Sequence, residues 1–251
     1  MIDILPMLLP GLLITLPLTI ISLGVGLVLA IVFTCLLETQ RGWITLPIQS
    51  LITFIRGVPL LVQIFLIYYG MAQFEVIQNS FFWPVLQEPF ACILIALSIN
   101  SACYTTVLLQ GAVQSIPKGE REACFTLGMS LFSQMRHVIL KRALILMWPS
   151  YTNEVIIILK STALAGSITL MDITGLMRQV IAKTFDPGPA LLMAGILYLI
   201  LFVLLQVLCK FIGKYFSIPL TKENQGFDSS ELINKFQGNH QGGDEGLRLG
   251  L

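Results

Sequence analysis

The chain has 251 residues, of which 55% are hydrophobic and only 12% are charged. Soluble domains carry about 25% charged residues, so this composition excludes an ordinary soluble domain. The net charge of +1 leaves no broad basic surface for nucleic acid. We therefore expect a protein that lies in a lipid bilayer.

The first uncharged stretch lies at the N-terminus, where no Lys, Arg, Asp or Glu occurs from Ile4 to Leu37. About 20 apolar residues cross a bilayer as a helix. No basic segment precedes this stretch, and it is too long for the core of a signal peptide, so we expect a retained first span. Apolar stretches predict five spans in all, at about 10–37, 58–74, 90–113, from Ala143 through Glu154 and beyond, and 188–209.

Lys and Arg in the connections indicate orientation, because cytoplasmic loops carry an excess of both. The connection 75–88 has neither, whereas 114–142 contains Lys118, Arg121, Arg136, Lys141 and Arg142. Four basic residues after the first and fifth spans fit the same side, and two in the fourth connection do not: Arg41, Arg56, Lys210 and Lys214, against Arg178 and Lys183. We expect an external N-terminus and a cytoplasmic C-terminus.

The end of the chain differs in composition from the rest. Residues 219–251 are rich in Gly, Gln, Asn and charge, so we expect a disordered cytoplasmic tail after a membrane domain at 1–218. The five cysteines show no metal-ligand or redox spacing, and we expect small buried apolar side chains at Cys35, Cys92, Cys103, Cys124 and Cys209.

The basic connection has the apolar periodicity of a helix. Apolar residues recur at spacings of three and four, which predicts one stripe on a helix over 118–136: Cys124, Leu127, Gly128, Leu131, Phe132 and Met135. Such a helix can lie in the headgroup layer, fold back on its own bundle or dock in another protein's groove. Gly inside a helix costs about 1 kcal/mol relative to Ala, so Gly128 favours close approach by a partner.

Several segments resemble a known family. The sequence EACFTLG at 122–128, followed by VIL at 138–140, resembles the EAA loop of ABC-importer permeases. Other segments, in the same order, resemble polar amino-acid permeases of the histidine, arginine and glutamine type, most closely the arginine-importer permease subunit of Gram-negative bacteria (the M-type subunit): RGVPLLVQ at 56–63, LIYYG at 66–70, NSACY at 100–104, QSIPKG at 114–119, YTNEV at 151–155, LKST at 159–162 and TLMD at 169–172. The resemblance covers about residues 1–218.

The resemblance implies an all-α membrane protein with about five transmembrane helices and a cytosolic amphipathic coupling helix, which is the type I ABC-importer permease fold. In that family the loop sits in a cleft of the ATPase subunit, which implies ATPase coupling for Glu122, Ala123, Leu127, Gly128 and Leu131. The implied partners are a dimer of ABC ATPase subunits, a second permease subunit (a paralogue or an identical copy) and a periplasmic amino-acid-binding protein. We expect no cofactor on this chain, with ATP and magnesium on the partner ATPase.

Two features depart from the family pattern. Lys141 stands where the family usually has proline, and Cys124 replaces its second alanine. Val107 and Gln110 stand where polar amino-acid permeases usually carry a Glu and an Arg. Since both members of that pair are replaced, no orphan charge is left.

Polar residues within the predicted spans are candidates for substrate binding, because such groups are costly in lipid and usually face a cavity or a partner. The candidates are Glu154, Asn100, Asn153, Lys160 and Ser161. Glu154 could attract a guanidinium or ammonium group, while the others orient the amine and carboxylate of an amino acid. Alternatively, the two Asn residues bond neighbouring helices and Lys160 extends to the interface.

Three functions were compared. A permease subunit for a polar amino acid, with arginine favoured, agrees with the absence of a P-loop, because the ATPase is then a separate chain. A secondary carrier or channel predicts inverted repeats or rings of ionisable groups, which the sequence lacks. A membrane enzyme is disfavoured because the sequence has no catalytic motif of the protease or hydrolase type and only two histidines, His137 and His240. We therefore expect a transport subunit in the bacterial inner membrane.

Overall fold

The computed structural model describes residues 4–216. Over this range the chain consists of helices joined by turns and short connections. The described residues up to Gly213 form one compact unit. The predicted tail at 219–251 lies outside the described residues.

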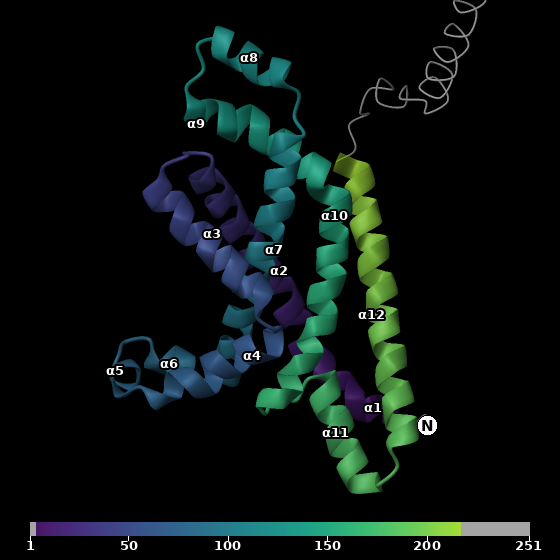
Figure 1. Cartoon of the computed structure of the whole chain (residues 1–251). Coiled ribbons are helices and arrows are strands. Elements are labelled where there is room, and N and C mark those ends of the chain that lie inside the picture. Colours follow the sequence, from purple (N-terminus) through teal and green to yellow (C-terminus); the bar gives the residue numbers. More distant parts are fainter. Residues whose placement is uncertain (1–3, 217–251) are drawn as a thin grey trace, which may run out of the picture. The chain divides into compact units, whose positions relative to one another are not determined.

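Between residues 4 and 216, three helices are each long and apolar enough to cross a membrane. The first is α2 (Leu12–Leu37), which continues from α1 (Leu5–Leu8) through the short η2 (Leu9–Gly11). The others are α7 (Pro89–Gln114) and α12 (Pro187–Phe216). The predicted spans at 10–37, 90–113 and 188–209 are therefore confirmed as helices. Figure 1 shows these three helices running toward the end where α8 and α9 lie, and α3 and α10 running back.

The second span differs from its prediction. The predicted span at 58–74 is only the second part of a bent pair of helices. The first leg of this pair is α3 (Gly42–Gly57), and the second leg, Leu60–Gln73, bends from it by 110°. This second leg consists of α4 (Leu60–Phe65), η3 (Leu66–Gly70) and η4 (Met71–Gln73). Val58 has extended backbone angles, φ −94° and ψ 132°, because the following Pro59 disfavours a helical conformation there.

The position of α3 also corrects the expected first connection. Arg41 precedes α3 and Arg56 lies in its last turn, so the two side chains belong to opposite ends of a helix about 24 Å long. They were expected in one cytoplasmic loop. The guanidinium of Arg56 lies 5.2 Å from the centre of the Tyr104 ring on α7, within the range of a cation–π interaction.

The fourth span is also a broken helix. The chain runs from α9 (Leu131–Gln134) through η5 (Met135–Ile139) and α10 (Leu140–Ser161) to η6 (Thr162–Ile168). It then bends by 48° into α11 (Ile173–Thr184), which the sequence did not predict. Pro149 lies inside α10 without ending it. α11 ends at Thr184, and α12 begins shortly after it, at Pro187.

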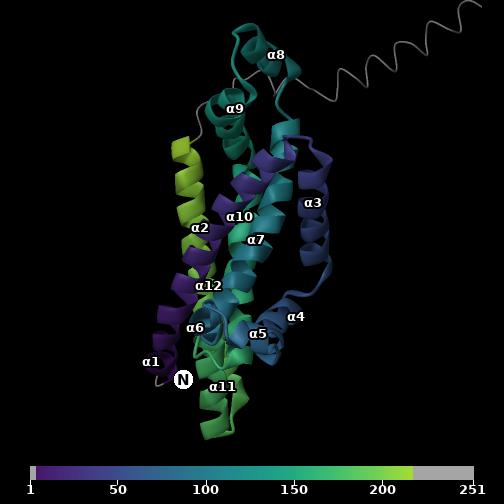
Figure 2. The ribbon, with the colours of Figure 1, turned by 90° about the vertical axis from the view of Figure 1, so that its left-hand side faces the viewer.

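The central helix of the compact unit is α7, which packs against α2, α3, α4 and α10 (Figure 2). Small residues allow α2 and α7 to approach closely, as is common between helices in membranes. At Gly26 an added Cβ would lie 2.8 Å from the Ser101 Cβ. Four of the five cysteines are buried, as expected, whereas Cys35 is only partly buried.

The α2–α7 contact predicts different effects for two glycines of one helix. We expect Gly26→Ala to destabilise the protein by about 1–3 kcal/mol, because the new methyl group overpacks against Ser101. Gly24→Ala is the matched control, since nothing lies within 4 Å of a Cβ there, and it should be neutral or stabilising. Thermal unfolding of the purified protein in detergent measures both. Equal melting temperatures for the two variants would contradict the packing described for α2 and α7.

Candidate functional site

The segment that joins α7 to α10 forms a helical hairpin, not one helix. It consists of α8 (Lys118–Thr126), a turn at 127–130, and α9, which starts at Leu131. The predicted single helix over 118–136 is therefore wrong. Gly128 in the turn has φ +72°, a left-handed conformation that glycine adopts readily.

Hydrogen bonds at the turn explain the position of Gly128. The Gly128 amide donates to the Phe125 carbonyl at 2.9 Å, and the Met129 amide donates to the Cys124 carbonyl at 3.2 Å. This pair of bonds is the Schellman motif, which ends a helix at a left-handed glycine. Ser130 then caps α9 by accepting from the Ser133 amide at 3.3 Å. Gly128 thus has a backbone reason for its presence, independent of any partner.

The turn divides the predicted apolar stripe into a buried part and an exposed part. Cys124 and Met135 are buried. Four large side chains around the turn are 74–81% exposed: Phe125, Leu127, Leu131 and Phe132. Glu122, Ala123 and Gly128 are also exposed, so all five residues expected to couple to the ATPase lie on the surface of this hairpin.

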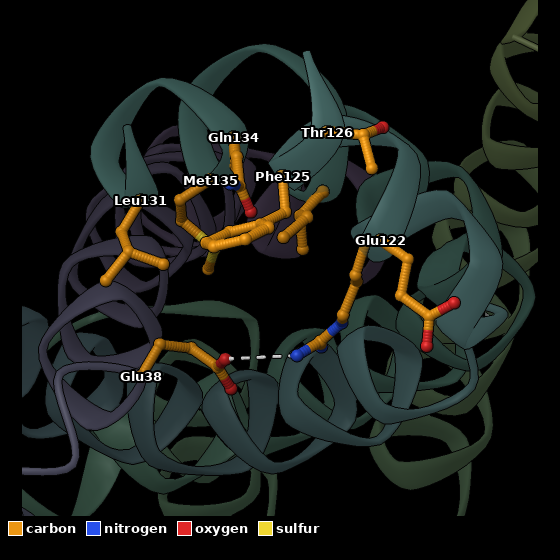
Figure 3. A pocket seen from close by; sticks show the side chains of 9 residues that line it. Glu38, Glu122, Phe125, Thr126, Leu131, Gln134 and Met135 are labelled. Carbon is orange, nitrogen blue, oxygen red and sulfur yellow. Dashed lines mark ion pairs between the residues drawn. The ribbon is translucent and has the colours of Figure 1, made fainter. Parts of the chain in front are cut away.

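Arg121 fixes the hairpin to two long helices. Its guanidinium donates to the Val113 carbonyl near the end of α7 at 2.9 Å and pairs with Glu38, just after α2, at 3.7 Å. A hollow of about 600 Å³ lies beside this ion pair, lined by Glu38, Arg121, Glu122, Phe125, Thr126, Leu131, Gln134, Met135 and Ile139 (Figure 3). Although the turn is exposed, α8 is therefore held firmly at its base.

The polar residues of the spans fall into two sets. Asn153 and Lys160 are exposed and lie on one face of α10, as their seven-residue spacing predicts. The Lys160 ammonium lies 5.8 Å from the centre of the Phe202 ring on α12. Ser161 is partly buried, and its hydroxyl donates to the Ile157 carbonyl at 2.9 Å.

Asn100 and Glu154 are buried, at 6% and 4% exposure. One oxygen of Glu154 has no hydrogen-bond partner among the described residues. A buried polar group without a partner is unfavourable, so this carboxylate is not explained as a contact between helices of the chain. It follows Asn153 directly in α10, so its side chain points about 100° around the helix from the exposed face with Asn153 and Lys160.

Asn100 makes a contact that the sequence did not indicate. Its amide donates to the Gln63 side-chain oxygen at 3.4 Å. The Gln63 amide in turn donates to the carbonyls of Ile55 and Val58, at 2.7 and 2.8 Å. Gln63 therefore ties the break between α3 and α4 to α7. A glutamine within an otherwise apolar stretch was the available signal, because polar groups at such depth need partners.

The sequence of the chain matches a known protein family. Residues 25–217 match the family model described as the inner membrane component of binding-protein-dependent transport systems. The chain belongs to this family. The permease is 40% identical over 192 residues to the octopine transport system permease protein OccM of Rhizobium meliloti, covering 76% of this chain and 78% of that protein. It is 43% identical over 187 residues to the arginine ABC transporter permease protein ArtM of Haemophilus influenzae, covering 73% and 81%.

Solved structures agree with the fold. The permease matches a crystal structure of an amino acid ABC transporter with histidines, with a TM-score of 0.74 and 27% identity over 86% of this chain and 96% of the other. It also matches the MetNI methionine ABC transporter in an inward-facing conformation, with a TM-score of 0.72 over 86% and 98% of the two chains. At 18% identity, this second match supports the fold alone. The all-α type I permease fold is thereby confirmed.

The Schellman turn predicts unequal effects of substitutions at Gly128. We expect Gly128→Ala to loosen the hairpin, because a left-handed conformation costs an alanine about 1–2 kcal/mol. Gly128→Asn should cost less, since Asn tolerates this conformation. Hydrogen exchange of the amides at 124–134 measures the opening of the turn. Gly119→Ala, where nothing lies within 4 Å of a Cβ, is the control; equal exchange in all three variants would contradict the role given to Gly128.

Proposed function

We propose that this permease moves a cationic amino acid, with arginine favoured, into the cytoplasm, and that a separate ATPase docked on the α8–α9 hairpin drives the movement. That the chain is a permease subunit of an ABC importer for amino acids follows from its family and its fold. The substrate, the docking site and the orientation are the proposal. The docking site is inferred from one observation, which is the exposed apolar edge of the hairpin.

The hairpin is suited to transmit movement. Large apolar side chains exposed together mark a contact with another protein or with lipid, and resemblance to the EAA loop favours a protein for this edge. The base of α8 is tied to α2 and α7 through Arg121. Closure of an ATPase dimer would displace this base together with the two helices, and a rigid-body rotation of this kind opens one side of a transporter as it closes the other.

Orientation follows from the same segment. An ATPase that uses cytoplasmic ATP places the hairpin in the cytoplasm, which agrees with the five basic residues at 114–142. The opposite end of the helices, with α11, then faces the periplasm. A periplasmic amino-acid-binding protein would deliver substrate there, and a second permease subunit, identical or paralogous, would complete the pathway.

The preference for a cation rests on Glu154 and on two relatives whose names specify arginine or octopine. In lipid, an acidic group attracts a guanidinium strongly, because little water screens it. The exposed face of α10, with Asn153 and Lys160, lies next to this charge. In the proposal Lys160 faces the substrate carboxylate, Asn153 and Ser161 orient its amine, and Asn100 supports the site from α7.

The docking site is tested on the exposed edge of the hairpin. The double variant Leu127→Ala/Leu131→Ala removes two side chains that are 79% and 81% exposed, so it should leave the fold intact. A few central side chains carry most of the binding energy of an interface, about 2 kcal/mol or more each, so truncating two at the centre of this edge should weaken co-purification of the ATPase and reduce substrate-stimulated ATP hydrolysis. Trp43→Ala, at a side chain that is 73% exposed in the first turn of α3, is the control. Full coupling in the double variant would exclude this surface.

Substrate preference is tested at the buried acid. Glu154→Gln keeps the shape and removes the charge. A charge-assisted hydrogen bond contributes about 1.5–3 kcal/mol, so we expect the half-saturation concentration for arginine to rise by roughly 10–100-fold. Radiolabelled uptake into vesicles holding the whole importer measures it. Glu75→Gln, at an exposed residue outside the long helices, should transport normally, and unchanged arginine uptake by Glu154→Gln would remove this residue from the site.

A further inference from the structure

The connection between η4 and α7 exposes a group of large apolar side chains. It contains α5 (Glu75–Gln78) and α6 (Trp83–Leu86), and residues 74–86 are called the aromatic segment below. Five of its side chains are 50–92% exposed: Phe74, Val76, Phe81, Phe82 and Val85. The stretch 75–88 contains no Lys or Arg. Neither the family nor the proposed transport function assigns a role to this segment.

Contacts place the aromatic segment at the end of a membrane span. The Cys92 thiol, in the first turn of α7, donates to the Leu86 carbonyl at the end of α6 at 3.0 Å. α7 begins at Pro89, only three residues after α6, and its residues from Phe90 to Leu97 are apolar. A bilayer crossed by α7 would therefore have its headgroups at the level of α6. Figures 1 and 2 both show α5 and α6 beside the helices, toward the end opposite α8 and α9.

The leg that leads into this segment runs along the membrane. Residues Leu60–Gln73 are bent by 110° from α3. Because α3 runs alongside α7, which crosses the bilayer, this leg lies close to the membrane plane. Most of its exposed side chains are also apolar or aromatic: Val62, Phe65, Leu66, Tyr69 and Met71. The aromatic segment thus continues an apolar surface that begins within the lipid-facing part of the chain.

We propose that the aromatic segment is an interfacial anchor, whose side chains insert into the boundary between headgroups and acyl chains of the leaflet at the α11 end. Aromatic residues concentrate at this depth in membrane proteins. Without Lys or Arg, the attraction comes from burial of apolar surface and not from anionic lipid. The polar residues between the aromatic ones, such as Gln78 and Asn79, remain in water. The anchor holds the α3–α4 bend at a fixed depth.

A fluorescent label measures the depth directly. Phe81→Cys, at a side chain that is 92% exposed, is labelled with bimane in the importer purified with its partner subunits and reconstituted into vesicles. The native cysteines are mostly buried, and the unsubstituted complex gives the background. We expect bimane emission to fall when the vesicles contain lipids brominated near the glycerol end of the acyl chains, with little effect of aqueous iodide.

Asn79→Cys, in the same segment and exposed, is the matched control and should show the reverse pattern. Phe82→Cys provides a second test position. If label at 81 and 82 is quenched by iodide and not by brominated lipid, the segment lies in water and the proposal is overturned. If neither quencher acts, another subunit covers the segment, which overturns it as well. The quenching result does not depend on the substrate or on where the ATPase docks. The anchor proposal can therefore fail while the proposed function stands, and the reverse.

Discussion

Backbone groups within lipid have no water to bond, so each place where a helix breaks needs its own polar partner. The permease meets this constraint at both of its bent spans. At the α3–α4 bend, the Gln63 amide bonds the carbonyls of Ile55 and Val58. At the η6–α11 bend, the Asp172 carboxylate accepts from the Gly175 amide at 2.8 Å, and Arg178 donates to the Gly166 carbonyl at 3.2 Å.

These partners also join helices that are distant in the sequence. Gln63 contacts Asn100 of α7, and the Tyr198 hydroxyl on α12 donates to Asp172 at 3.3 Å. The same side chains that satisfy a break therefore fix its position in the bundle. The broken helices beside the exposed polar face of α10 are thus held in place by such contacts.

The sequence predicted the continuous helices well and the broken ones poorly. The uncharged run from Ile4 to Leu37 and the apolar run before Cys209 allow one reading only, because their length alone specifies a span. The sequence around Pro59 does not specify its span in this way. The α3 leg contains the polar residues Thr45, Gln49, Ser50 and Arg56, so its hydropathy is too low to predict a span. The more apolar stretch after Pro59 was therefore predicted as the span instead of the helix that packs on α7.

The site shows a similar division. Periodicity located a helical segment, but it treated Gly128 as part of one helix and did not separate the buried Cys124 and Met135 from the exposed residues of the stripe. Asn153 and Lys160 share a face, as spacing alone predicts. That Asn100 contacts Gln63, and that Glu154 is buried with an unpaired oxygen, depends on how helices pack, which no local pattern in one sequence contains.

The single arginine at the base of α8 has a mechanical consequence. Arg121 bonds the end of α7 and also pairs with Glu38, just beyond the end of α2. The hairpin is therefore attached to two helices, which pack closely against each other at Gly26 and Ser101. A displacement of α8 at this residue would act on both helices and not on one alone.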